Sequence, residues 1–351
     1  MKRALVISGG GSKGAFAGGV AEYLINHEKR DYDMFLGTST GSLLISHLAL
    51  HQLDELKSLY TSVDQQSIFS NNPFRIRNVD GQKVVSINHI NTLWNFLNGR
   101  KTFGESKYLR DLIRRNITRE MYEEILEREK EVVVTVSNLT TSQIEYKSNK
   151  DCTYDDFCDW IWGSCNYVPF MSLLEKDHCQ YADGGFGALV PIREAILRGA
   201  TEIDAIILET EVTVVNKLPA KNPFSLLFDV FDFMLTHVER HNITIGKLAA
   251  KSKDVQLNLY YTPTILTTNS LVFDKKMKYI YKLTKDGFEL DLSFFDYYLF
   301  DKQKSFYNRK LINLFGPPRK RNTILKKEHY EIAGSLQRSF TEIVFHLLDI
   351  T

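Results

Sequence analysis

Apolar and polar positions form alternating blocks over the first 60 residues of the chain. Short apolar runs at residues 3–7 and 32–38 end in small or glycine residues, as buried strands do. Segments 13–28 and 40–60 carry apolar residues at helical spacing instead. This order of strand, helix, strand and helix predicts a parallel sheet with helices on its faces.

The middle of the chain fits the same class. A charged helical pattern covers residues 109–130, and residues 131–148 read as two strands around a turn. Residues 191–209 predict a helix that ends near Gly199 and a strand after it. We therefore expect an α/β domain with a mostly parallel sheet over residues 1–215.

Beyond residue 215 the pattern changes to a long amphipathic segment at 222–251. Its apolar positions fall near one face at 3.6 residues per turn: Phe224, Leu227, Phe228, Phe231, Leu235 and Val238. Such a face usually packs into a core, and a membrane-facing role is the alternative. We predict that residues 216–351 form a mainly helical extension that acts as a lid or as a membrane or regulatory segment.

Composition narrows the setting. The 351 residues are 43% apolar and 25% charged, which is typical of a soluble globular protein. A net charge of +1 gives no general attraction to nucleic acid, although residues 301–328 hold nine Lys or Arg and two acidic residues. No apolar stretch is long enough for a membrane span or a signal peptide. We expect a cytoplasmic protein with reduced cysteines, and peripheral membrane contact through residues 224–238 and 301–328 is a hypothesis.

The first glycine-rich turn has more than one interpretation. Gly9, Gly11 and Gly14 match the dinucleotide fingerprint between a strand and a helix. The acidic residue that this fingerprint needs after the second strand is missing, and the Gly-Lys-Ser/Thr of a Walker loop is missing too. Backbone N–H groups at such a turn also suit a transient oxyanion, and a turn without any ligand is the third alternative.

A second motif follows the second predicted strand. Gly37, Thr38, Ser39, Thr40 and Gly41 form G-x-S-x-G, the nucleophile-elbow pattern between a strand and a helix. The sharp turn crowds the serine backbone, so it needs small residues two positions before and after the serine. The alternative is an ordinary glycine-flanked helix start.

The base for this serine is less clear from the pattern. None of the nine histidines stands in a context that marks a base. Asp183 lies between a short strand-like stretch and the glycines Gly184 and Gly185. On this pattern alone, a plain Asp-Gly turn is the favoured interpretation, and a carboxylate base is the alternative.

Taken together, these motifs resemble the patatin-like phospholipases. The resemblance covers residues 3–210 and rests on five stretches in the family's order: GGGSKG at 9–14, GTSTG at 37–41, WGSCNYVPF at 162–170, DGG at 183–185 and VPIREAILRGA at 190–200. Gly163 departs mildly from the family, which often has alanine there.

The resemblance implies a three-layer α/β/α fold and a Ser-Asp dyad with Ser39 as nucleophile and Asp183 as base. It also implies no cofactor, no metal and a lipid ester as substrate. The implied oxyanion loop consists of Gly9, Gly10, Gly11, Lys13 and Gly14.

The resulting expectation is a serine acyl hydrolase of lipid esters, similar to phospholipase A or lysophospholipase, that works through an acyl-enzyme. A Rossmann-type nucleotide-binding protein is one alternative. It explains the first glycine turn but leaves the other two motifs without a role. A catalytically dormant lipid-binding or regulatory protein is the second alternative, and covalent labelling of Ser39 would separate it from an enzyme.

Overall fold

The computed structural model describes residues 2–79, 82–209, 220, 223–262, 283–284 and 287–290. The chain divides into two compact units, Met1–Leu292 and Ser293–Thr351, and all described residues belong to the first. The basic stretch 301–328 therefore lies outside the described residues. No described helix is both long and apolar enough to cross a bilayer.

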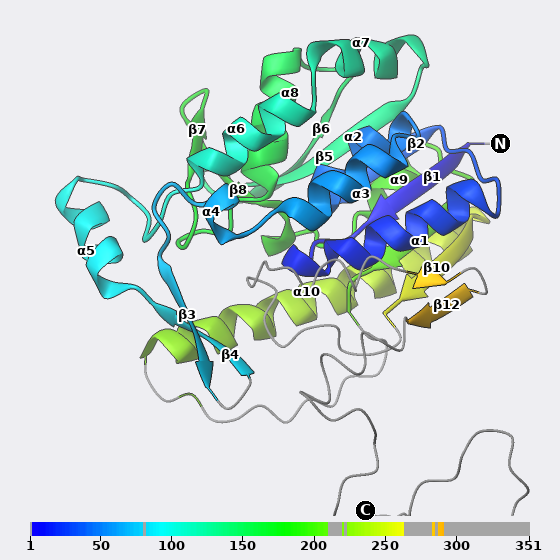
Figure 1. Ribbon diagram of the computed structural model, residues 1–351. Coiled ribbons are helices and arrows are strands. Elements are labelled where there is room, and N and C mark those ends of the chain that lie inside the picture. The colour runs from blue at the N-terminus through cyan, green and yellow to red at the C-terminus, as the bar shows by residue number, and fades with distance from the viewer. Residues whose placement is uncertain are drawn as a thin grey trace, which may run out of the picture. The chain divides into compact units, whose positions relative to one another are not determined.

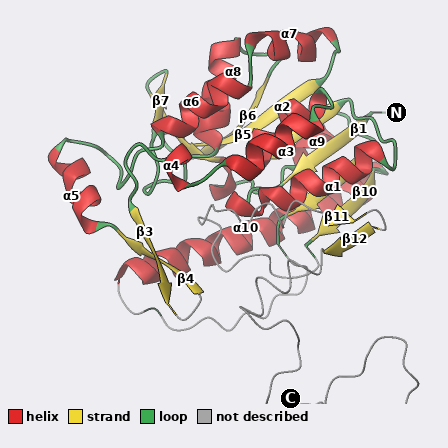
Figure 2. Cartoon of the chain, in the orientation of Figure 1, coloured by secondary structure: helices red, strands yellow, loops and turns green. Residues whose placement is uncertain are grey.

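A mixed sheet of eight strands forms the centre of the unit (Figures 1 and 2). Five strands run parallel, in the spatial order β10 (Gln256–Tyr261), β9 (Glu202–Ile207), β1 (Arg3–Ile7), β2 (Met34–Thr38) and β5 (Glu131–Asn138). Three more strands extend it through antiparallel pairs: β6 (Gln143–Ser148), β8 (Cys179–Asp183) and β7 (Leu174–Lys176). A separate hairpin pairs β3 (Phe74–Val79) with β4 (Gln82–Ile87), and β11 (Leu283–Thr284) pairs with β12 (Gly287–Leu290).

Helices cover both faces of the sheet. The N-terminal helices α1 (Gly14–Asn26), α2 (Thr40–Ala49) and α3 (Leu53–Ser62) pack on one another, and α2 also contacts α8 (Tyr154–Ser164). The opposite face carries α9 (Ile192–Leu197) and α10 (Pro223–Lys253). The remaining helices are α4 (Gln65–Ile68), α5 (His89–Leu97), α6 (Lys107–Asn116) and α7 (Arg119–Glu127), with the short 3₁₀ turns η1 (Gly11–Lys13) and η2 (Gly184–Phe186). These layers confirm the predicted α/β/α class.

The core explains why the central strands read as continuous apolar runs. Along β1, Ala4 and Val6 join the cluster beneath α9 and α10, while Leu5 and Ile7 are equally buried on the other side. Side chains of a strand alternate between faces, so a strand covered on both faces needs apolar residues at every position.

Several details differ from the sequence-based expectation. The helical pattern at 40–60 is two helices, because the chain turns at His51 with a φ of 59°. The pattern at 109–130 is also two helices, and the Thr118 side chain caps the second by accepting a hydrogen bond from the Met121 N–H. The strand β10 adds to the sheet beside β9, which the pattern did not predict. The predicted boundary at residue 215 falls outside the described residues and stays a prediction.

Candidate active site

Two strand ends meet on β5, and they carry the serine and aspartate singled out in the sequence. The last residue of β2, Thr38, pairs with Thr135, and the last residue of β8, Asp183, pairs with Val136. Because β2 runs parallel and β8 antiparallel to β5, the two strands approach each other from opposite directions. Ser39 and Asp183 thus become neighbours although 144 positions separate them in the chain.

Ser39 occupies a strained turn between β2 and α2. Its φ is 53°, a conformation that non-glycine residues rarely adopt. The flanking glycines leave room for this turn: a Cβ at Gly37 would lie 2.5 Å from the Gly41 carbonyl carbon, and one at Gly41 would lie 2.4 Å from the Ile7 oxygen. The local geometry is that of a nucleophile elbow.

Asp183 closes the pair. The Ser39 hydroxyl donates a hydrogen bond to Asp183 Oδ2 at 2.6 Å, and the Gly185 N–H donates to Asp183 Oδ1 at 2.8 Å. Asp183 is buried, and this burial raises the pKa of its carboxyl from 3.8 to about 7, against the lowering effect of the two hydrogen bonds. A carboxyl with a pKa near neutrality is suited to accept and return a proton.

The loop after α8 holds both members of this pair in place. The Ser39 N–H donates to Ser164 Oγ at 2.9 Å, and the Cys165 thiol donates to the Ser39 carbonyl at 3.2 Å. The Asp183 N–H donates to the Asn166 carbonyl at 2.9 Å. Sequence reasoning matched this stretch to a family motif but assigned it no task. The structure shows three consecutive residues that fix the backbones of Ser39 and Asp183.

The glycine loop between β1 and α1 lies against the same turn. The Thr40 hydroxyl and the Tyr60 hydroxyl both donate to the Gly11 carbonyl at 2.9 Å. A Cβ at Gly9 would lie 3.1 Å from Ser39 Cβ, so the loop passes directly beside the serine. None of the hydrogen bonds between described residues uses the N–H groups of Gly10 or Gly11. These donors are therefore candidates for binding negative charge next to Ser39 Oγ.

Lys13 is positioned differently from a solvated charge. Its side chain is buried and forms an ion pair with Glu209, after β9. Glu239 of α10 lies near both groups. Burial, together with the charge of Glu209, raises the pKa of Glu239 to about 8, against the lowering effect of Lys13 and Arg240. The ammonium group is thus already neutralised beside the glycine loop, which favours a role in fixing the loop.

Other candidate groups stay apart from the pair. No described histidine hydrogen-bonds Ser39 or Asp183, and His47 is buried in α2 with the Nδ1 atom unpaired. The four cysteines form no disulfide bond. The described residues hold no group of three or more His, Cys, Asp or Glu side chains arranged to bind a metal ion.

Comparison with known proteins now identifies the family. The family model for patatin-like phospholipases matches residues 5–196, which is more than half of the chain. The chain belongs to this family. Membership confirms the resemblance drawn from the sequence motifs.

Two further comparisons add little to this result. The structure of VipD from Legionella pneumophila is similar, with 15% identity and a TM-score of 0.36, over 60% of this chain and 50% of that chain. The chain thus spans about half the length of that protein. No curated protein matches the sequence.

An aromatic cluster borders the Ser39–Asp183 pair. Tyr167 stacks on Phe186 and on Phe170, with ring centroids 5.5 and 5.8 Å apart. Burial, and after it the charge of nearby Asp183, raises the pKa of Tyr167. Phe228 and Phe231 of α10 pack onto these rings, with Phe228 only 4.5 Å from Phe170. The apolar face predicted for residues 224–238 therefore packs against the rest of the protein near the candidate site.

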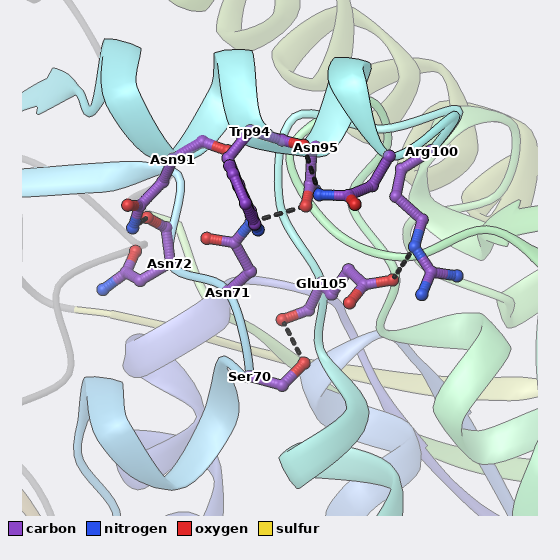
Figure 3. Close-up of a pocket in the computed structure, with 9 residues that line it drawn as sticks. Ser70, Asn71, Asn72, Asn91, Trp94, Asn95, Arg100 and Glu105 are labelled. Atoms are coloured by element: carbon purple, nitrogen blue, oxygen red, sulfur yellow. Dashed lines mark hydrogen bonds and ion pairs between the residues drawn. The ribbon is translucent and has the colours of Figure 1, made fainter.

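A polar pocket lies apart from the Ser39–Asp183 pair. It has a volume of about 630 Å³, and amide side chains from α5 and from the stretch before β3 dominate its wall (Figure 3). Its residues are Ser70, Asn71, Asn72, Asn91, Trp94, Asn95, Asn98, Arg100 and Glu105. The sequence analysis assigned nothing to this region.

Proposed function

We propose that this chain is a serine esterase of phospholipids or lysophospholipids that works through Ser39 and Asp183. The observation that carries the proposal is the 2.6 Å hydrogen bond from the Ser39 hydroxyl to the buried Asp183 carboxylate. A serine on a strained turn, bonded to a carboxyl with a pKa of about 7, provides a nucleophile and a base without a histidine.

The reaction begins when Asp183 accepts the hydroxyl proton of Ser39 and the freed Oγ attacks the acyl carbonyl carbon of the ester. The carbonyl oxygen takes up the negative charge and faces the N–H groups of Gly10 and Gly11. Each such donor lowers the barrier by about 3 kcal/mol when it is preorganised. The carbon–oxygen bond of the ester then breaks, and the departing alcohol takes the proton from Asp183.

The second half releases the acyl group. A water molecule loses a proton to Asp183 and attacks the acyl carbonyl, and the oxyanion faces the same two N–H groups. The bond to Ser39 Oγ breaks, Oγ recovers the proton, and the fatty acid leaves. Tyr167 and Phe186, the partly exposed stacked rings of the aromatic cluster, offer the acyl chain an apolar surface beside these steps.

Fluorophosphonate labelling tests the proposal, because the reagent modifies activated serines. We expect mass spectrometry to place the label on Ser39, with labelling abolished in Ser39→Ala and strongly slowed in Asp183→Asn. Ser46→Ala is the matched control, since Ser46 lies on the adjoining helix α2 and its buried hydroxyl has no partner in the described structure. Labelling elsewhere, or full labelling of Ser39→Ala, would contradict the assignment.

A product analysis then separates the two substrate classes. Wild-type protein is incubated with phosphatidylcholine or with lysophosphatidylcholine, and the released fatty acids are measured by chromatography. Release from either ester, absent in Ser39→Ala, supports the proposal. Labelled protein that releases fatty acid from neither would refute the substrate class while leaving the nucleophile in place.

A further inference from the structure

The apolar residues of helix α5 lie mainly on the face that points away from the protein core. Ile90, Leu93, Trp94 and Leu97 follow the spacing of a single helix face, yet their exposed fractions are 73%, 58%, 64% and 73%. A surface helix normally turns its apolar stripe toward the protein. Here the stripe faces solvent, and contiguous exposed apolar side chains of this size usually mark an interaction surface.

The opposite side of α5 holds the helix to the protein through amides. Asn91 and Asn95 line the polar pocket together with Asn71 and Asn72, and Trp94, at the edge of the stripe, borders the same pocket (Figure 3). The Asn71 amide donates to Asn95 Oδ1, the Asn91 amide donates to the Asn72 carbonyl, and the Asn95 amide donates to the Thr102 carbonyl. These hydrogen bonds fix which face of α5 points inward, so the apolar face points outward.

Charge around α5 narrows what this face contacts. Residues 65–107 contain six Lys or Arg against two Asp or Glu, a net charge of +4 in a chain whose total is +1. Arg75, Arg100 and Lys101 are exposed, and Lys101 forms an ion pair with Glu175, which lies outside this stretch. Arg100 shares Glu105 at 3.1 Å with Lys107 at 3.8 Å, so one carboxylate serves two cations. An apolar stripe with a basic surround complements an anionic lipid surface.

Helix α5 also connects to the candidate site through packed aromatic rings. Phe96 at the end of α5 contacts Phe103 at 5.7 Å between centroids, and Phe103 contacts Phe170 at 5.6 Å. Phe170 in turn stacks on Tyr167, next to Asp183. A continuous series of aromatic contacts therefore runs from helix α5 to Tyr167, near Asp183.

We propose that α5 is a membrane-docking helix that inserts Ile90, Leu93, Trp94 and Leu97 into the surface of an anionic bilayer. The proposal rests on the proposed function, because a lipid hydrolase must reach esters that are packed in a bilayer. The basic residues hold the protein to the headgroups, and the inserted side chains bring the aromatic cluster to the level of the acyl chains.

Vesicle binding of the full chain tests the docking helix. Wild-type protein is sedimented with vesicles of phosphatidylcholine alone and of phosphatidylcholine mixed with phosphatidylglycerol. We expect tighter binding to the anionic vesicles, and weakening by about tenfold or more in Ile90→Asn/Leu97→Asn. Leu197→Asn is the matched control, because Leu197 is 60% exposed on α9. Equal binding by the double variant and the control would overturn the proposal.

Tryptophan emission gives a second readout from the same samples. Of the three tryptophans, Trp160 and Trp162 are buried, whereas Trp94 lies on the exposed stripe. Anionic vesicles should shift the emission to shorter wavelengths, and Trp94→Phe should remove the shift. A shift that persists in Trp94→Phe would place the contact elsewhere.

Two further measurements separate this proposal from its alternatives. Hydrolysis of a water-soluble short-chain ester should be unchanged in Ile90→Asn/Leu97→Asn, while hydrolysis of vesicle lipid should fall in step with binding. Soluble-ester hydrolysis by a wild-type protein that ignores vesicles would refute the docking helix and spare the proposed function. Vesicle binding through α5 without any ester hydrolysis would do the reverse. A dimer in light scattering that the double variant abolishes, with no vesicle binding, would assign the face to a second copy of the chain.

Discussion

Burial of the Asp183 carboxyl costs stability when the group is ionised but suits it to accept a proton. The substitution Asp183→Asn should separate these two effects. The pKa of this carboxyl rises from 3.8 to about 7 on folding, chiefly because it is removed from water. Between about pH 4 and pH 7 the native protein keeps the proton that the unfolded chain has lost. The native state thus binds more protons, and the free energy of unfolding falls as the pH rises through this window.

The size of the effect follows from the shift. A rise from 3.8 to about 7 corresponds to about 4 kcal/mol of lost stability once both states are ionised. About 3 kcal/mol of this falls between about pH 5 and pH 8.5. Asparagine has nearly the same shape and still offers an oxygen to the Gly185 N–H, but it has no charge to bury. Relative to wild type, Asp183→Asn should therefore gain about 3 kcal/mol over that interval while losing activity.

Urea unfolding at the two pH values measures this gain. The quantity compared is the difference in unfolding free energy between variant and wild type, so any pH-independent effect of the substitution cancels. Asp111→Asn, at an exposed position of α6, serves as the control for an Asp-to-Asn change outside the site. A difference between Asp183→Asn and wild type that is the same at both pH values would refute the burial argument.

Three other outcomes follow from the same geometry. The kcat/KM for a soluble ester should rise with pH and level off above about pH 7, because only ionised Asp183 accepts the serine proton; a flat profile from about pH 5 to pH 8 would contradict this role. Gly41→Ala should lower the free energy of unfolding by about 3 kcal/mol, since its Cβ would lie 2.4 Å from the Ile7 oxygen, and an unchanged thermal midpoint would count against the elbow geometry. Tyr60→Phe removes a hydroxyl that donates to the Gly11 carbonyl, so kcat should fall about tenfold with little change in KM; the reverse pattern would indicate a role in substrate binding.

The parts of the site that could be predicted from the sequence are those with strict steric needs. Gly37 and Gly41 flank Ser39 because a Cβ at either position would collide with backbone, and that need is visible as a motif. The short strands could also be predicted, because a strand buried on both faces needs an unbroken run of apolar residues. Once the motifs resembled a family, Asp183 could be paired with Ser39 over a distance that no local pattern spans.

Other features depend on tertiary contacts that leave no local signal. The residues of α5 at positions 90, 93, 94 and 97 have the spacing of a buried helix face, and only the amide contacts of Asn91 and Asn95 show that this face points outward. The work of Ser164 and Asn166 was equally hidden, because it uses one hydroxyl and one backbone carbonyl in an irregular loop. The strand β10 joins the sheet after a long helix, and its half-exposed edge position weakens the pattern that marks a strand.

The meeting of β2 and β8 on β5 also has a consequence for the order of folding. Ser39 and Asp183 come together only after β5 has accepted both neighbours in the correct register, because a slip by one residue would send Asp183 to the other face of the sheet. Because this hydrogen bond joins residues far apart in the sequence, we expect it to form late in folding. Reactivity toward a fluorophosphonate, followed during refolding, would therefore report when the central sheet is complete.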